Sequence, residues 1–355
     1  MKLSIIVPHH HETQTKMKPL LDSLENQQGV NWDEIEILIS HDSKSSPEID
    51  LSKYENLSAH TTQYSVPGLN NVGMNRQNAL NHATGELIAF CDADDKLSTP
   101  IALHSMLDCA AKDPDYDVWQ FRPLFEVIGQ PGNYVQTPES NIWMYAKLYR
   151  HSFLVDHKIE FTELIQYSED VYYNMVVYNS GARVKVYSNM FPYVQLANTS
   201  SITKKDNGAY NYTRSLPDFL HSIRQAIYAL LTHGEPVQKC GFVAAGATML
   251  FYTKYVEIFY KLGKSLKVKN LDDFKVSAEA NLKAFIDEFD PKMLYIRANY
   301  DSNQAFFETL KQNSYLQAQD MVEDYQTFME RISGIKMPEV KVAKPEDLKN
   351  NEKKD

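Results

Sequence analysis

The sequence has few cysteines, and those it has are far apart. Cys91, Cys109 and Cys240 show no C-x-x-C spacing, so they match neither a disulfide framework nor a zinc site. Scattered, unpaired cysteines are typical of proteins from a reducing compartment. We therefore expect a cytoplasmic location.

Long apolar runs are also missing. The N-terminal run over residues 3–7 is shorter than the core of a signal peptide. The longest apolar stretch, around residues 241–252, is far below the ~18 to 20 residues of a spanning helix. These absences predict a soluble protein and leave open a peripheral contact with the inner face of a membrane.

Basic residues do not balance the acidic ones. The chain has 36 Lys and Arg against 46 Asp and Glu, a formal net charge of −10. This balance argues against a general affinity for nucleic acid, so we expect no nucleic-acid partner. Tyrosine, in contrast, is abundant, with 22 residues. Core packing explains such a count, but tyrosines also suit sugars, because the ring covers an apolar sugar face while the hydroxyl bonds a polar edge.

The first part of the chain alternates between strand and helix patterns. The predicted strands span 3–7, 35–39 and 87–91, and the predicted helices begin near 17, 70 or 71, and 98. This order is typical of a parallel sheet with right-handed crossovers, in which ligands bind at the carboxyl ends of the strands. Pro8, Asp42 and the carboxylates that begin at Asp92 all fall at such ends.

The pattern changes twice along the rest of the chain. Short mixed strands follow residue 116, helical stripes follow residue 214, and the charged tail is poor in apolar residues, as disordered segments are. We therefore predict an α/β domain over 1–214, with halves of about 1–115 and 116–214, a helical region over 215–335 and a disordered tail over 336–355. The wide apolar stripes of the helical region predict packing on the first domain or a homo-oligomer contact.

The strongest chemical signal is Asp92-Ala93-Asp94-Asp95, directly after an apolar strand. Neighbouring carboxylates repel one another, and a divalent cation offsets that cost. Mg²⁺ and Mn²⁺ accept carboxylate oxygens together with those of a diphosphate. A solvated acidic turn or a helix cap is the alternative.

Other polar groups are weaker signals when taken singly. Glu169 and Asp170 stand near a predicted helix start, where acidic residues commonly complement the helix dipole. The triplet His9, His10 and His11 resembles a metal-binding cluster, but adjacent residues rarely all face one ion. None of these groups assigns a function alone.

Taken in order, the segments of the first ~200 residues resemble glycosyltransferase family 2, the inverting nucleotide-sugar transferases of the GT-A fold. The matching segments are SIIVPHHHE (4–12), HDSKS (41–45), GMNRQNAL (73–80), LIAFCDADD (87–95), SED (168–170) and the run 193–203. Any one of these matches would be weak, whereas their common order is specific. The chain departs from the family pattern at His11, His41 and Gln77.

The resemblance implies a role for each matched position. The implied nucleotide-sugar-binding residues are Pro8, His10, Glu12, Asp42, Arg76, Asp92, Ala93 and Asp94. Asp94 and Asp92 are the implied ligands of Mn²⁺ or Mg²⁺, and Asp170 is the implied general base. The positions that the resemblance places in acceptor binding or in support of other residues are Asp95, Glu169, Tyr193 and Ser201.

The activity that the resemblance implies is inverting transfer of a hexosyl or N-acetylhexosaminyl unit from a UDP-sugar to an acceptor hydroxyl. The implied acceptor is a bacterial cell-surface glycan, such as a teichoic acid, capsule or exopolysaccharide, or its lipid-linked precursor. Two alternatives stay open. A nucleotidyltransferase uses a similar sheet, although the loop from Pro8 to Gln14 lacks the Gly-rich basic pattern of that class. A catalytically inactive sugar-binding or scaffold protein is the other.

Overall fold

The computed structural model describes residues 2–68, 71–138, 140–198, 213–262, 269–289, 323 and 325–336. The chain divides into two compact units, Met1–Pro236 and Val237–Asp355. The first unit extends beyond the predicted boundary at 214, because helix α8 (Ser215–Thr232) packs on helix α6 (Glu169–Asn179). The predicted tail lies outside the described residues apart from Lys336.

The first unit is built on a seven-stranded sheet with the order β10-β6-β9-β4-β1-β2-β3. Its strands are β1 (Leu3–His9), β2 (Ile35–His41), β3 (Thr61–Ser65), β4 (Leu87–Phe90), β6 (Val118–Phe121), β9 (Lys147–Arg150) and β10 (Val184–Tyr187). Strands β1 to β4 form parallel pairs, whereas β9 runs antiparallel to both β4 and β6. The predicted α/β fold with a mostly parallel sheet is therefore confirmed.

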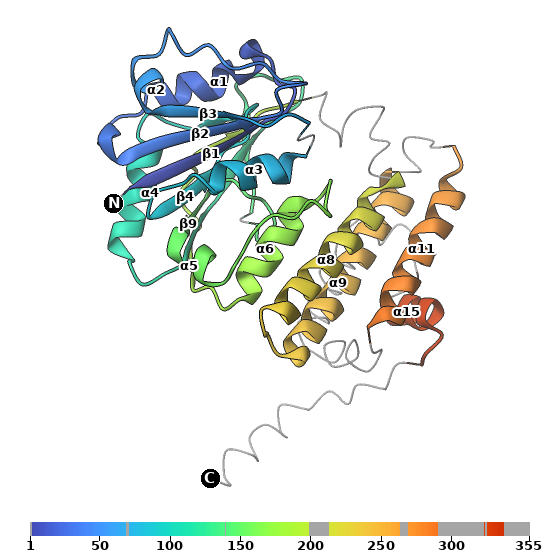
Figure 1. The fold of residues 1–355 in the computed structure, drawn as a ribbon. Helices are drawn as coiled ribbons and strands as arrows, with labels where there is room; N and C mark the ends of the chain where they lie inside the picture. The colour runs from blue at the N-terminus through green and yellow to red at the C-terminus, as the bar shows by residue number, and fades with distance from the viewer. Residues whose placement is uncertain are drawn as a thin grey trace, which may run out of the picture. The chain divides into compact units, whose positions relative to one another are not determined.

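Helices cover both faces of this sheet (Figure 1). Every residue of β1 is buried, as expected for a continuous apolar run in a parallel sheet. Leu3, Ile5 and Val7 pack with the apolar stripe of α1 (Gln14–Glu25) on one face. On the other face, α3 (Val72–Leu80) packs on β1 and β2.

Capping residues determine where the helices at the site begin. The Thr13 side chain accepts a hydrogen bond from the Lys16 N–H at the start of α1. Of the two asparagines predicted to cap α3, Asn71 does so by accepting from the Met74 N–H. The other helices that the structure describes in the first unit are η1 (Trp32–Glu34), α2 (Glu55–His60), α4 (Ala102–Lys112) and α5 (His151–Asp156).

A second, smaller sheet has the order β5-β11-β7-β8. Its strands are β5 (Lys96–Leu97), β11 (Tyr193–Gln195), β7 (Pro123–Glu126) and β8 (Tyr134–Gln136). Strand β5 follows the Asp92–Asp95 segment directly and pairs with β11. This pairing brings Tyr193 to the acidic segment from a distant part of the chain.

The second unit is helical, as predicted. It contains α9 (Val237–Val256), the π-helical turn η2 (Glu257–Leu262), α11 (Leu271–Glu288) and α15 (Tyr325–Ser333). Arg331 of α15 donates hydrogen bonds to both Glu279 and Glu323. A hydrogen bond of 2.7 Å joins the hydroxyls of Thr248 and Tyr325 inside this unit. The homo-oligomer contact expected of these helices stays a prediction.

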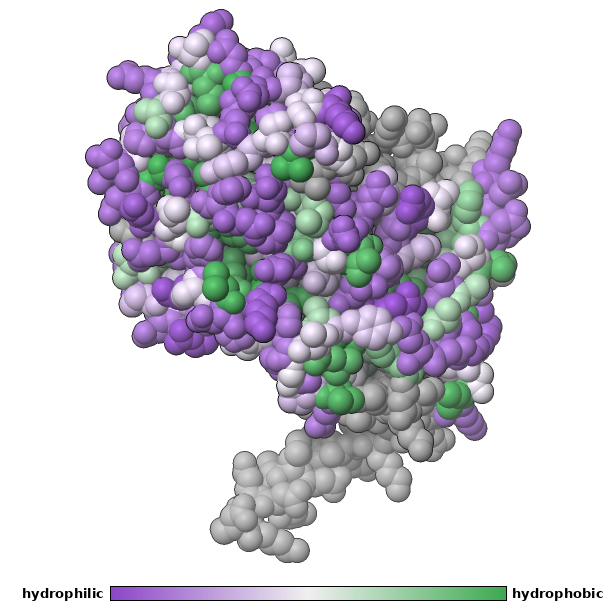
Figure 2. Space-filling model, in the orientation of Figure 1, coloured by the Kyte–Doolittle hydropathy of each residue, from purple (hydrophilic) through white to green (hydrophobic). Residues whose placement is uncertain are grey.

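The surface is predominantly hydrophilic on the face that Figure 2 shows, with apolar side chains in small separate patches. Across the described ranges, no helix combines the length and the apolarity that crossing a membrane requires.

Candidate active site

The predicted residues converge at the carboxyl edge of the main sheet. His10 and Glu12 follow β1, Asp42 follows β2, and the acidic segment that begins with Asp92 follows β4. Because β2, β1 and β4 are adjacent parallel strands, their carboxyl ends meet at this edge. Pro8 lies inside β1, opposite Ser40 of β2.

Asp95 is the buried member of the acidic segment. Its Oδ2 accepts a hydrogen bond of 2.9 Å from the Tyr193 hydroxyl, and its Oδ1 accepts one of 2.9 Å from the Leu196 N–H. The same Tyr193 oxygen accepts from the Asp92 N–H at 3.0 Å. Burial and the charges of Asp92 and Asp94 raise the pKa of Asp95. These contacts fit a supporting role for Asp95 and Tyr193, which hold the segment against β11.

Asp94 is partly exposed, with 26% of its side chain accessible, as is Asp92 with 29%, whereas Asp95 is buried. Its Oδ2 accepts a hydrogen bond of 2.6 Å from the Asn198 amide, and the Lys16 Nζ lies 3.8 Å from the same oxygen. Ala93, which separates it from Asp92, is buried. Asp92 and Asp94 are therefore the carboxylates of this segment that a ligand can reach.

The donor set around Asp94 fits a metal that shares its ligands with a substrate. Within the part of the chain that the structure describes, no three His, Cys, Asp or Glu side chains gather as a metal cage. Mg²⁺ commonly binds through one or two carboxylates plus substrate phosphates rather than in such a cage. Asp94, with its neighbour Asp92, supplies that kind of partial site.

Arg76 links the acidic segment to α6. Its Nη2 donates to Asp92 Oδ1 at 2.6 Å and its Nη1 donates to Glu169 Oε1 at 2.5 Å, while only 5% of its side chain is exposed. Burial alone lowers the pKa of Arg76, but the two carboxylates outweigh it and raise that pKa overall. Gly73 permits this approach, because a Cβ there would lie 3.2 Å from the Glu169 Cβ. Arg76 thus occupies the centre of the site between two predicted residues.

Asp170 stands in the first turn of α6, directly after Ser168 and Glu169. Its Oδ1 accepts a hydrogen bond of 2.8 Å from the Val171 N–H. Burial, and then the neighbouring charge of Glu169, raise the pKa of Asp170 to about 7. A carboxylate with this pKa can both accept and release a proton near neutral pH.

The loops after β1 and β2 are held by their own backbone. Glu12 Oε2 accepts from the His10 N–H at 2.6 Å, and burial raises the pKa of Glu12 to about 7. Asp42 Oδ1 accepts from the N–H groups of Lys44 and Gly68, at 3.0 and 2.7 Å, and these bonds lower the pKa of Asp42. Asp42 therefore fixes the turn at Gly68 that borders the predicted nucleotide site.

Ser201 cannot be placed in this geometry, because it lies outside the described residues, as does the rest of the matched run 199–203. The structure also adds two residues that had no predicted role. Asn198 bonds to Asp94, and Lys147 is buried on β9 with a pKa lowered to about 7 by burial. The unusual sequence signal at Lys147 is a lysine inside the aromatic-rich segment 143–149.

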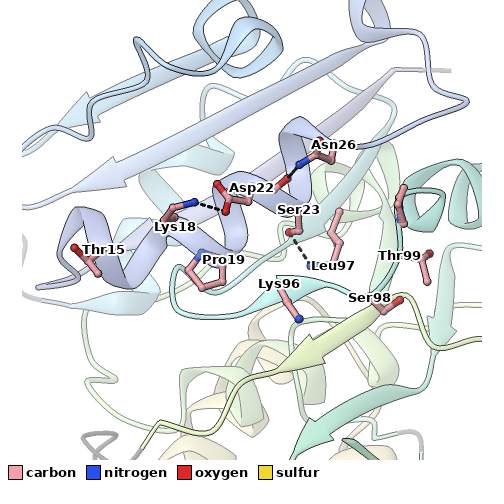
Figure 3. Close-up of a pocket in the computed structure, with 11 residues that line it drawn as sticks. Thr15, Lys18, Pro19, Asp22, Ser23, Asn26, Lys96, Leu97, Ser98 and Thr99 are labelled. Atoms are coloured by element: carbon pink, nitrogen blue, oxygen red, sulfur yellow. Dashed lines mark hydrogen bonds and ion pairs between the residues drawn. The ribbon is translucent and has the colours of Figure 1, made fainter. Parts of the chain in front are cut away.

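A groove of about 480 Å³ lies between α1 and the run 96–100, which begins with β5 (Figure 3). Its lining comprises Thr15, Lys18, Pro19, Asp22, Ser23, Asn26 and the run 96–100. Lys18 pairs with Asp22, and the Ser23 hydroxyl accepts from the Leu97 N–H, so much of the polar lining bonds within the wall. None of the predicted site residues lines this groove.

Comparisons with known proteins agree with the motifs. The model of the family described as "Glycosyl transferase family 2" matches residues 4–188. EpsH of Bacillus subtilis (strain 168), which is named as a glycosyltransferase, is 26% identical over 170 residues, covering 42% of this chain and 48% of EpsH. The chain therefore spans about half of the length of this curated relative.

Solved structures show the same fold. S. aureus TarS 1–349 in complex with UDP-GlcNAc has a TM-score of 0.62 and 22% identity, over 91% of this chain and 94% of that chain. A longer S. aureus TarS structure has a TM-score of 0.59 and 21% identity, over 82% of this chain and 50% of that chain. The family model covers more than half of the present sequence. The chain therefore belongs to glycosyl transferase family 2.

Proposed function

We propose that this protein is a glycosyltransferase that transfers a hexosyl or N-acetylhexosaminyl unit from a UDP-sugar, with inversion, and that Asp170 is its general base. The observation that carries the proposal is the Arg76 bridge, which joins Asp92 at the predicted donor site to Glu169, the neighbour of Asp170. The UDP and UDP-GlcNAc complexes of S. aureus TarS support the choice of donor.

The donor side of the site holds the nucleotide and its diphosphate. We assign the nucleotide to the loops after β1 and β2, with His10, Glu12 and Asp42, and the diphosphate to the segment Asp92–Asp94. Asp94, together with Asp92, would hold Mn²⁺ or Mg²⁺, which supplies positive charge for the leaving diphosphate. Lys16, with its Nζ at 3.8 Å from Asp94 Oδ2, adds a cation at the same place.

The acceptor side performs the proton transfer. Asp170 takes the proton from the acceptor hydroxyl while that oxygen forms a bond to the anomeric carbon of the donor. The bond from this carbon to the diphosphate oxygen breaks in the same step, and UDP leaves with the electron pair. A single displacement inverts the anomeric centre, so an α-linked donor yields a β-linked product. Base catalysis of this kind contributes about 10² to 10⁴-fold to the rate.

The acceptor that we propose is a hydroxyl of a bacterial cell-surface glycan, free or lipid-linked, modified at the cytoplasmic face of the membrane. The sequence motifs of the family suggest this class, and the occurrence of similar proteins in the bacteria S. aureus and B. subtilis is consistent with a bacterial acceptor.

Two measurements on the purified protein test the function. Calorimetry with UDP should show binding that requires Mn²⁺ or Mg²⁺ and that weakens in Asp94→Ala, and incubation with UDP-sugars and glycan acceptors should release UDP together with a β-linked product. Release of pyrophosphate from a nucleoside triphosphate would instead identify a nucleotidyltransferase. UDP binding without hydrolysis or transfer of any UDP-sugar would identify an inactive binder.

A further inference from the structure

An aromatic segment lies beside Asp170 and has no part in the mechanism above. It comprises Trp143 and Tyr145, which precede β9 and which we call the aromatic platform. The side chain of Tyr145 is buried, and that of Trp143 is half-buried. Burial, followed by the charges of Asp92, Asp95 and Asp170, raises the pKa of Tyr145. Tyr145 therefore lies within the field of the carboxylates at the reaction centre.

Buried polar bonds tie the platform to the helix that carries Asp170. The Asn174 amide donates to the carbonyl oxygens of Ile142 and Trp143, at 2.6 and 3.3 Å, and Asn174 is fully buried. Asp170 and Asn174 are four residues apart on α6, so they lie on the same face of that helix. The bonded carbonyls place the backbone at Trp143 next to this face.

The ammonium group of Lys147, on β9, binds the backbone of the same segment. It donates to the carbonyl oxygens of Ser140 and Trp143, and its side chain is buried. The Asp170 charge acts on this ammonium and opposes the lowering of its pKa by burial. Two different elements, α6 and β9, thus fix the position of Trp143 relative to the base.

The rings of the platform form an ordered stack. Tyr145 stacks on Tyr193 with centroids 4.8 Å apart and an interplanar angle of 5°, and Trp143 stacks on Tyr145 at 5.8 Å and 15°. Phe125 of β7 supports Trp143 at 5.1 Å. Tyr193 in turn bonds to Asp95. The stack therefore runs from the buried acidic segment to the partly exposed indole of Trp143.

We propose that the aromatic platform binds the pyranose ring of the acceptor, with Trp143 as the stacking surface, and so selects acceptors that present a sugar ring. This inference rests on the proposed function, because an acceptor hydroxyl must come within about 2.6 to 3.2 Å of its base. The ring that carries this hydroxyl must then lie close to Asp170, whose charge acts on Tyr145 of the platform and whose helix bonds to the Trp143 backbone through Asn174. The C–H face of a pyranose packs on an aromatic ring, whereas an open-chain polyol phosphate offers no such face.

Trp143→Leu and Trp143→Phe test this proposal, with Trp32→Leu as the matched control. Trp32 is also half-buried against the same core but stacks on His60, away from the site. With UDP-GlcNAc as donor, the acceptors are the methyl pyranosides of glucose, galactose and N-acetylglucosamine, and ribitol 5-phosphate. We expect Trp143→Leu to raise the pyranoside KM by about three- to tenfold, Trp143→Phe to restore most of the affinity, and Trp32→Leu to change nothing. UDP-GlcNAc affinity should stay within about twofold in all three.

Tryptophan fluorescence gives a readout that needs no turnover. In the presence of UDP, adding a methyl pyranoside should change the emission of the wild type and of Trp32→Leu, and this change should be absent in Trp143→Leu. Three results would overturn the proposal. These are an unchanged pyranoside KM in Trp143→Leu, a loss of donor affinity in this variant without a change in pyranoside KM, and exclusive transfer to ribitol 5-phosphate. Pyranoside binding through Trp143 without any transfer would refute the proposed function and leave the sugar-binding surface in place.

Discussion

The two predicted halves of the first unit, the donor half over about 1–115 and the acceptor half over about 116–214, hold their polar side chains in different ways. In the donor half, Glu12 and Asp42 accept hydrogen bonds from backbone N–H groups of their own or neighbouring loops. In the acceptor half, Asn174 and Lys147 reach across from other elements and donate to backbone carbonyl oxygens of residues 140–143. The donor loops therefore depend on local turns, and the acceptor site depends on a few buried side chains.

Arg76 is the point at which the two halves meet. It belongs to a helix of the donor half and bonds to Glu169 of the acceptor half. Because buried ionic groups are costly to leave unpaired, this residue couples the stability of one half to the integrity of the other. The comparison predicts that substitutions in the acceptor half and at Arg76 have larger effects than those in the donor loops.

The largest effect is expected for Asp170→Asn, which keeps the shape and removes the proton acceptor. Transfer should fall by about two to four orders of magnitude, while UDP-sugar affinity changes by much less than tenfold. Initial rates of transfer and calorimetry on one preparation measure both. If Glu169 and Asp170 only complement the α6 dipole, Asn at this position leaves turnover intact, and near-normal transfer would refute the catalytic role.

Asp170→Asn should also change how the stability of the protein depends on pH. The folded-state pKa of Asp170, about 7, lies above the ordinary value of 3.8, so the folded protein binds the proton more tightly. The contribution of Asp170 to the free energy of unfolding is therefore fully present below its ordinary pKa of 3.8. It is lost as the pH rises to about 7. Asp170→Asn should therefore melt at the same or a higher temperature than the wild type at pH 8. A lower melting temperature than the wild type at pH 8 would contradict the burial argument.

The next effect is expected for Arg76→Gln, which leaves Asp92 and Glu169 without their shared cation. Breaking a buried ion pair costs about 3 to 5 kcal/mol. Urea unfolding should therefore show a large decrease in the free energy of unfolding of Arg76→Gln. Arg183→Gln is the matched control, because Arg183 also pairs with a carboxylate, Asp117, but its side chain is 60% exposed. Water screens the exposed Arg183 guanidinium, and the buried Asp117 keeps Arg150 and the Arg183 N–H as partners, so this variant should lose only about 0 to 1 kcal/mol. Equal losses in the two variants would show that Arg76 is not the link between the halves.

Lys147→Met tests the acceptor half alone. The substitution removes the Lys147 donor from the Ser140 carbonyl and one of the two donors from the Trp143 carbonyl, which keeps Asn174. A buried carbonyl left unsatisfied costs about 1 to 3 kcal/mol. The folded pKa of Lys147 is about 7, below the ordinary 10.5, so wild-type stability from this group rises as pH increases between these values. In thermal unfolding, the stability of Lys147→Met should rise less with pH than that of the wild type. The variant should also have a higher acceptor KM, with little change in UDP affinity. An unaltered pH dependence would show that the ammonium is not buried in solution.

The sequence predicts the donor half better than the acceptor half for a physical reason. Asp42, Asp92 and Asp94 stand directly after apolar strands, and neighbouring parallel strands bring their carboxyl ends together, so strand order alone places them. The α/β fold and the helical second unit follow from the same periodicities. The match at Asp170 depended on the family pattern, because an acidic pair at a helix start is common on its own.

The rest of the site depends on contacts that have no local signature. Tyr193 reaches Asp95 only because β11 pairs with β5. The antiparallel strand β9 and the Asn174 and Lys147 bonds depend on packing between distant segments. Arg76 was predicted near the nucleotide, and only the burial of α3 against α6 reveals that its guanidinium lies between two carboxylates. Long-range pairing of this kind is decided by the whole core and not by any one window of sequence.

The smallest effect is expected for substitutions of two lysines of α1. Comparing the UDP affinities of these variants tests where the donor binds. Lys16 Nζ is 3.8 Å from Asp94 Oδ2, whereas Lys18 pairs with Asp22 in the groove of Figure 3. Lys16→Ala removes a cation from the proposed diphosphate site, so UDP affinity should fall by about two- to tenfold. Lys18→Ala breaks an exposed pair worth about 0.3 to 0.5 kcal/mol, and UDP affinity should stay the same. Calorimetry with UDP and Mn²⁺ measures both. A larger loss of UDP affinity in Lys18→Ala than in Lys16→Ala would indicate that the donor binds in the groove and not at the carboxyl edge of the sheet.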